Sequence, residues 1–267
     1  MTSSSSRSAA DPWLDGRPPH IPADGSPLPP VCLLPGDPAR VSMSAPLFDE
    51  FEIIGSRREF TLGVGRYRGA SVAVCSTGIG GPSTEIALIE LHRLGVGTFI
   101  RVGGMGATSP DIEPGAITSV RRTFRDGGAA RFYDDGTAPV DVDPAVAAAL
   151  DVAAERRGER LTSVSVLSCD SYYVGEGRPV PGFEEAAQRR LAAAEQLGAE
   201  AMDMECETVY VIARALGARY GALLAAHGNR ATDEWLEDYE PVQVRLLRIA
   251  LDASVALTAG ARGGTPG

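Results

Sequence analysis

The chain has 267 residues, 44% of them hydrophobic, and a formal net charge of −10. This length favours one large α/β domain or at most two small ones, and the acidic balance argues against a nucleic-acid partner. The sequence contains no Lys, which excludes catalysis by a lysine nucleophile or a Schiff base.

The cysteines and the apolar runs indicate a protein of the cytoplasm. Four cysteines, Cys32, Cys75, Cys169 and Cys206, are widely spaced without a CxxC pair, so we expect buried reduced thiols and no zinc site. No apolar run approaches the ~20 residues of a membrane span, and the N-terminus lacks the apolar core of a signal peptide. We therefore expect a cytoplasmic location and no membrane partner.

Both ends of the chain lack the periodic pattern of packed elements. Residues 1–19 are rich in Ser, Pro and Asp, and we expect a disordered tail there. Residues 20–260 show no repeat and no linker, which predicts a single domain, followed by a flexible tail at 261–267. At the start of this domain, the apolar run 31–34 predicts a strand that ends in a glycine turn at 35–40.

The segment 72–107 has the clearest succession of elements. Its pattern predicts a strand, a glycine loop, a helix, a strand and a second glycine loop, at 72–75, 76–81, 82–94, 98–102 and 103–106. The two loops of such a βαβ unit meet at the carboxyl ends of the strands, where α/β proteins bind ligands. Arg101 ends the second strand, and a cation in an apolar strand indicates an anionic ligand.

The remaining elements continue this alternation of strands and helices. Further strands are predicted at 51–54, 59–64, 116–123, 161–169 and 220–226, and helices at 144–157, 183–197, 205–217 and 241–259. The alternation predicts an α/β fold with a largely buried mixed sheet.

Three arginines indicate which kind of anion the expected site would bind. Arg40, Arg58 and Arg101 each follow or end a predicted strand near a glycine or a small polar residue. Several guanidinium groups together with backbone N–H groups suit a phosphate dianion; the alternative is that these arginines form surface salt bridges. A nicotinamide dinucleotide is disfavoured because Pro82 interrupts the glycine pattern that such a site needs.

Carboxylates and aromatic residues suggest the rest of a ligand. Asp203 and Glu205 suit the vicinal hydroxyls of a sugar, or they complement the dipole of the helix that follows. The segment 170–178 combines two tyrosines with Glu176 and Arg178, which suits a planar heterocycle or an ordinary polar loop. His227 ends a strand, close to the expected site.

Four motifs resemble the uridine phosphorylase branch of the nucleoside phosphorylase superfamily: PGDPAR (35–40), REF (58–60), CSTGIGGPST (75–84) and TFIRVGGMGA (98–107). The PHI motif at 19–21 is similar to the purine branch. The resemblance implies a three-layer αβα sandwich with a mixed central sheet and a homohexamer built from dimers. It implies the conversion of a nucleoside and phosphate to free base and ribose 1-phosphate, without a cofactor.

The resemblance also implies roles for individual residues. Phosphate would contact Gly36, Arg40, Arg101 and Gly104, with Arg58 from a neighbouring subunit. Ribose would contact Asp203, Met204 and Glu205, with His20 from that neighbour. The base would face Tyr172, Glu176 and Arg178, with Asn229 and Arg230 behind them. Arg101, Arg178 and Glu205 would be catalytic, and Glu59, Ile79 and Ser83 match positions that bind a monovalent cation, K⁺, between subunits.

Three positions depart from the family pattern. Gly104 stands where the family usually has a hydroxyl residue, Asp203 replaces the first Glu of a Glu-Met-Glu motif, and Glu176 replaces the Gln of Gln-x-Arg. An ionised glutamate only accepts hydrogen bonds, so Glu176 suits guanine better than uracil, yet Asn229 stands where the purine branch has Asp. We expect uridine as substrate; the alternatives are a purine nucleoside phosphorylase, a nucleosidase that uses water, and a nucleoside-binding protein without turnover.

Overall fold

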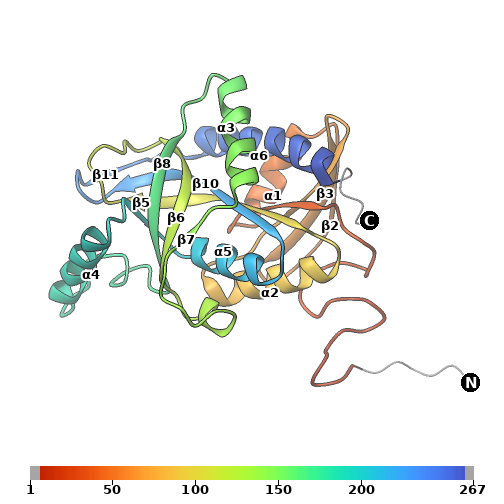
Figure 1. The fold of residues 1–267 in the computed structure, drawn as a ribbon, viewed down its shortest axis with the longest axis horizontal. Coiled ribbons are helices and arrows are strands. Elements are labelled where there is room, and N and C mark those ends of the chain that lie inside the picture. The colour runs from red at the N-terminus through yellow and green to blue at the C-terminus, as the bar shows by residue number, and fades with distance from the viewer. Residues whose placement is uncertain (1–6, 262–267) are drawn as a thin grey trace, which may run out of the picture.

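A mixed sheet forms the middle layer of the computed structural model, which describes residues 7–261 (Figure 1). Eleven strands belong to it among the described residues: β1 (Val31–Leu34), β2 (Glu50–Arg57), β3 (Phe60–Tyr67), β4 (Ala70–Cys75), β5 (Thr98–Ala107), β6 (Ile117–Asp126), β7 (Val140–Asp141), β8 (Thr162–Cys169), β9 (Ala201–Asp203), β10 (Arg219–Asn229) and β11 (Glu234–Trp235). Their order is β11-β10-β6-β8-β9-β5-β1-β4-β3-β2, with β7 paired to β6.

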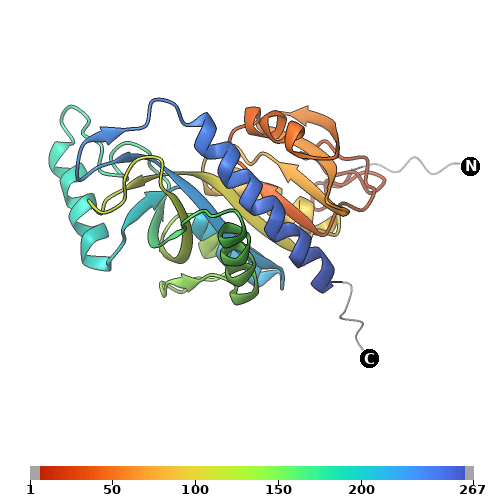
Figure 2. The same cartoon turned by 90° about the horizontal axis from the view of Figure 1, so that it is seen from above.

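Helices cover both faces of this sheet. α2 (Gly81–Arg93) and α5 (Cys206–Ala215) pack on one face, around Leu88 and Tyr210. α1 (Ala39–Ser44), α3 (Pro144–Arg156) and α6 (Glu240–Ala261) pack on the other, and Figure 2 shows α6 running diagonally across it. This arrangement confirms the predicted αβα sandwich with a mixed central sheet. α4 (Glu184–Leu197) lies outside the layers, at the end of the molecule where β11 also lies (Figures 1 and 2).

Five strands of the sheet form a closed ring. β10 pairs in parallel with β5 and antiparallel with β6, while β8 and β9 complete the circuit from β6 back to β5. The parallel strands β4, β1, β5 and β10 lie side by side, so their carboxyl ends open on a common edge. This edge is where an α/β sheet binds its ligand.

The prediction of a second glycine loop at 103–106 is wrong: these residues belong to β5 and pair with β10, whose register shifts between Ala226 and Gly228. A Cβ atom on Gly103 would lie 3.0 Å from Cζ of Arg101, and one on Gly104 would lie 2.5 Å from Cε1 of His227. The glycines therefore make room for two functional side chains rather than for a turn.

The ends of the chain fall partly outside the described residues. Residues 1–6 and 262–267, which belong to the tails expected at 1–19 and 261–267, lie outside them. Within 7–19, Asp11 accepts a 3.0 Å hydrogen bond from Arg93, whose guanidinium carbon lies 4.1 Å from the ring centroid of Trp13. Part of the expected N-terminal tail thus contacts the end of α2. Among the described residues, no helix is both long and apolar enough to span a membrane.

Candidate active site

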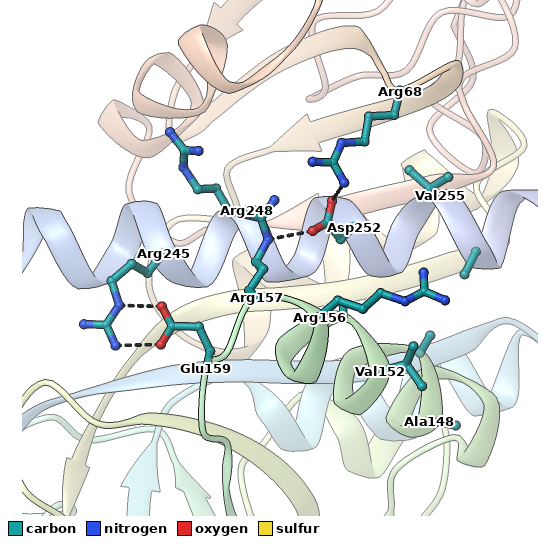
Figure 3. A pocket seen from close by; sticks show the side chains of 13 residues that line it. Arg68, Ala148, Val152, Arg156, Arg157, Glu159, Arg245, Arg248, Asp252 and Val255 are labelled. Atoms are coloured by element: carbon teal, nitrogen blue, oxygen red, sulfur yellow. Dashed lines mark hydrogen bonds and ion pairs between the residues drawn. The ribbon is translucent and has the colours of Figure 1, made fainter.

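A hollow of about 770 Å³ lies away from this edge, between α3 and α6 (Figure 3). Its carboxylates are already paired with arginines: Asp252 with Arg68 and Arg157, and Glu159 with Arg245. A second hollow, of about 670 Å³, opens at the carboxyl ends of the parallel strands. The predicted residues lining it are Gly36, Arg40, Glu59, Ile79, Ser83, Arg101, Gly104, Tyr172, Glu176, Arg178, Asp203, Met204 and Glu205, and we call it the sheet-edge pocket. Its volume suits a ligand of nucleoside size.

Arg101 forms the floor of this pocket and is already paired. Its side chain is 6% exposed; Nε donates to Asp203 at 3.0 Å, and Nη2 forms an ion pair with Glu205. Burial alone would lower the pKa of Arg101, but the two carboxylates outweigh this effect and raise the pKa. Arg101 is therefore a fixed cation with two anionic partners.

The two carboxylates differ in the contacts left to them. Oδ2 of Asp203 accepts hydrogen bonds from Arg101 and from the backbone N–H groups of Glu205 and Cys206, and Oδ1 accepts from Ser168. Asp203 thus holds the start of α5 against β5. Glu205 accepts a 2.6 Å hydrogen bond from the Gly80 N–H and lines the pocket. Burial raises the pKa of Glu205, and Arg101 opposes the rise.

Among the arginines that line the pocket, Arg40 alone makes no ion pair with a described residue. It follows the turn after β1 and lines the pocket, but it makes no ion pair with a described residue, and its buried Nε has no hydrogen-bond partner. Burial and the neighbouring charge of Arg101 lower the pKa of Arg40. A guanidinium keeps its proton in proteins, so Arg40 carries a partly buried positive charge without a compensating anion. An anion bound beside Arg40 would reduce the free-energy cost of burying that charge.

The segment 172–178 supplies the opposite end of the pocket. Glu176 is 5% exposed and forms an ion pair with Arg178, whose guanidinium carbon lies 3.7 Å from the ring centroid of Tyr172. Burial raises the pKa of Glu176, and Arg178 opposes the rise. Glu176 is therefore a hydrogen-bond acceptor next to an aromatic and a guanidinium plane, which suits the edge of a heterocycle.

Four predicted residues do not line the sheet-edge pocket. Arg58 is exposed in the turn between β2 and β3, with φ of 53°. His20 is bound through Nδ1 to Glu90 at 2.7 Å. Asn229 uses its whole amide on the backbone of Ser109, Ile112, Ala231 and Thr232, and Arg230 donates to Gly177 at 2.8 Å. The last two thus tie the end of β10 to neighbouring loops.

Glu59, Ile79 and Ser83 lie together at the rim. The Ser83 hydroxyl donates to the carbonyl of Ile79 at 3.3 Å, and the Ile79 side chain is 78% exposed. A Cβ atom on Gly78 would lie 2.7 Å from Cγ of Glu59 and 3.2 Å from Oγ of Ser83. A carboxylate, a hydroxyl and a carbonyl are the donor types that a hard cation prefers.

The pocket residues that the sequence did not assign to the site include Met105, Met202 and Trp235. His227, which the sequence places close to the expected site, lines the pocket. Burial and the charges of Arg40 and Arg101 lower its pKa to about 4. Trp235 comes from the two-residue strand β11, for which no sequence pattern gives a signal.

Comparison with known proteins identifies phosphorylases as relatives of this chain. The family model "Phosphorylase superfamily" matches residues 30–255. A uridine phosphorylase of Thermococcus kodakarensis is 40% identical over 205 residues, which is 76% of this chain and 74% of that protein. A guanosine phosphorylase of Halorubrum lacusprofundi is 31% identical over 248 residues, 90% and 98% of the two chains. A uridine phosphorylase of Treponema pallidum is 34% identical over 240 residues, 88% and 92%.

We predict that His227 stays neutral down to about pH 4 in the folded protein. Between pH 6.5, the ordinary pKa of histidine, and about pH 4, His227 binds a proton in the unfolded chain but not in the folded protein. The contribution of His227 to the free energy of unfolding is therefore lost as the pH falls through this range. An NMR titration of the three histidines, with His227→Phe to assign the signal, measures the pKa. A midpoint near 6.5 would contradict the prediction.

Proposed function

The chain belongs to the phosphorylase superfamily, and from this premise we propose a phosphate-dependent nucleoside phosphorylase whose main substrate is uridine. The products are the free base and ribose 1-phosphate. The observation that carries the proposal is Arg40, a guanidinium that lines the pocket with a buried Nε lacking a partner. Water as acceptor would leave this cation uncompensated, whereas phosphate matches it.

The pocket supports a division of the substrate into three parts. Phosphate lies at Arg40, Gly36 and Gly104; ribose lies over Met204 and Glu205; the base lies against Tyr172, Glu176 and Arg178, all of which line one hollow. Asp203 has its oxygens occupied by protein donors, so we assign it a positioning role for Arg101 and α5.

The reaction needs alignment and electrostatics rather than a covalent enzyme intermediate. A phosphate oxygen forms the new bond to C1′ while the bond from C1′ to the base nitrogen breaks, and the electron pair leaves with the base. The sugar passes through an oxocarbenium-like state, which the phosphate dianion and Glu205 stabilise. Arg178 stabilises the negative charge on the departing base, and holding phosphate against C1′ lowers the entropic part of the barrier.

A second copy of the chain completes the site in this proposal. Arg58 is exposed outside the pocket, and Ile53, Ile54 and Ile79 are exposed apolar side chains at 45%, 42% and 78%. These features support a dimer that brings Arg58 and His20 to a neighbouring pocket, and a hexamer built from such dimers. Glu59, Ile79 and Ser83 then fit a K⁺ ion at the subunit boundary.

The four cysteines are buried free thiols, which supports a reducing, cytoplasmic location.

Glu176 favours a second candidate, a phosphorylase of guanosine or a related purine nucleoside. An ionised carboxylate accepts from two adjacent N–H groups, as on guanine, while uracil presents a carbonyl beside its N–H. The choice between the two bases therefore depends on one side chain.

We predict phosphate-dependent release of base from uridine, measured with a panel of nucleosides with and without phosphate. Arg40→Met should raise the KM for phosphate about tenfold or more, because charge-assisted hydrogen bonds contribute ~1.5–3 kcal/mol. Arg156→Met, in the other hollow (Figure 3), is the control and should leave KM unchanged. Release of base without phosphate, or none from any nucleoside, would contradict the proposal.

Glu176→Gln should raise kcat/KM for uridine about tenfold and lower it for guanosine, because the amide supplies a donor to the uracil carbonyl. Burial raises the pKa of Glu176, and a protonated carboxyl group can donate a hydrogen bond as an amide does. The ratio of uridine turnover by the unchanged protein to turnover by Glu176→Gln should therefore increase as the pH falls. Kinetics of both substrates across pH test this. Equal uridine turnover by the two proteins would overturn this account of Glu176.

A further inference from the structure

His227 occupies the phosphate end of the sheet-edge pocket, next to Arg40. Its ring lies flat against Gly104, because a Cβ atom there would lie 2.5, 2.6 and 2.9 Å from Cε1, Nδ1 and Nε2. The centroid of the Tyr239 ring lies 5.2 Å from that of the imidazole, and the two ring planes are tilted by 36°. The Arg40 guanidinium carbon lies 5.8 Å from the Tyr239 ring centroid. The imidazole is thus held by these contacts near Arg40, whose charge acts on it.

Gln243 determines which nitrogen of His227 carries the proton. Nε2 of Gln243, on a side chain buried in α6, donates to the carbonyl of Gly103 at 3.1 Å and lies 2.9 Å from Nε2 of His227. Since a carbonyl only accepts, the amide atom facing both groups is nitrogen, and its second N–H points to His227. Nε2 of His227 is therefore an acceptor, and the proton of the neutral ring sits on Nδ1.

Within residues 7–261, Nδ1 of His227 makes no hydrogen bond. Among the described residues no hydrogen-bond acceptor contacts it, and the low pKa of His227 keeps the ring neutral with this single N–H. Arg40 lines the same pocket, and its buried Nε has no hydrogen-bond partner among the described residues. Arg40 and His227 therefore each bring a donor without a described acceptor to the lining of this pocket, and Gly104, which lacks a side chain, makes the space for the His227 ring.

We propose that the Nδ1–H of His227 donates a hydrogen bond to the phosphate co-substrate, an inference that rests on the proposed phosphorylase function. Gly104 and His227 act as a pair in this role: the glycine admits the ring, and the ring supplies the donor that a side chain at position 104 would otherwise supply. Gln243 fixes the tautomer that makes Nδ1 a donor.

Two amide variants distinguish the roles of the two ring nitrogens of His227. The amide of Gln reaches the position of Nε2, and the amide of Asn reaches that of Nδ1. His227→Gln should raise the KM for phosphate about tenfold, the loss of one hydrogen bond to a charged group, and change the nucleoside KM less than about twofold. His227→Asn should keep the phosphate KM within about threefold of the unchanged protein, because its amide can still donate.

A double-mutant cycle tests the pairing with Gly104. Gly104→Ala removes no donor, but its Cβ displaces the ring, so we expect a rise in phosphate KM of similar size. In the His227→Ala background the same change should have no further effect. Circular dichroism and thermal melting of each variant confirm that the comparison is made between folded proteins.

The outcomes separate the inference from the proposed function. If the unchanged protein shows no phosphate-dependent turnover, the proposed function is wrong. If it is active but His227→Gln leaves the phosphate KM unchanged, the hydrogen bond is absent. If His227→Gln and His227→Asn raise it equally, His227 only fills space, and the inference is also overturned.

Discussion

The buried ion pairs of Arg101 with Asp203 and Glu205 are the constraint on which the pocket depends. They join β5 to β9 and to the start of α5, and Glu205 extends the connection to the glycine loop before α2 through the Gly80 N–H. Removing one partner of such a pair leaves a buried charge, which typically costs ~3–5 kcal/mol. With Arg101 so engaged, Arg40 is the pocket arginine that makes no ion pair with a described residue and is left to bind an incoming anion.

The charged groups along the pocket therefore differ in whether they have a partner within the protein. At the base end Glu176 is paired with Arg178, and at the ribose end Glu205 is paired with Arg101. At the phosphate end the donors of Arg40 and His227 have no acceptor among the described residues. A preorganised set of donors that becomes satisfied only with its ligand is what positioning and electrostatic catalysis require.

The sequence predicted the layered fold because alternating strands and helices leave few topologies. It placed Arg40, Arg101 and Glu205 in one pocket because parallel strands end on one edge. Its error at residues 103–106 has a physical cause: glycine marks both turns and close approaches, and a local pattern does not distinguish them. The contacts of His227 with Gly104 and of Gln243 with Gly103 were missed for a related reason, since they join segments more than 100 residues apart.

The central claim is that the unpaired donors hold phosphate as the acceptor of the sugar. Phosphorus-31 NMR of the products formed from uridine and inorganic phosphate tests it most directly. The account predicts a ribose 1-phosphate signal that grows in equal amount to the uracil released, as the inorganic phosphate signal declines. Release of uracil with free ribose and undiminished phosphate would contradict it.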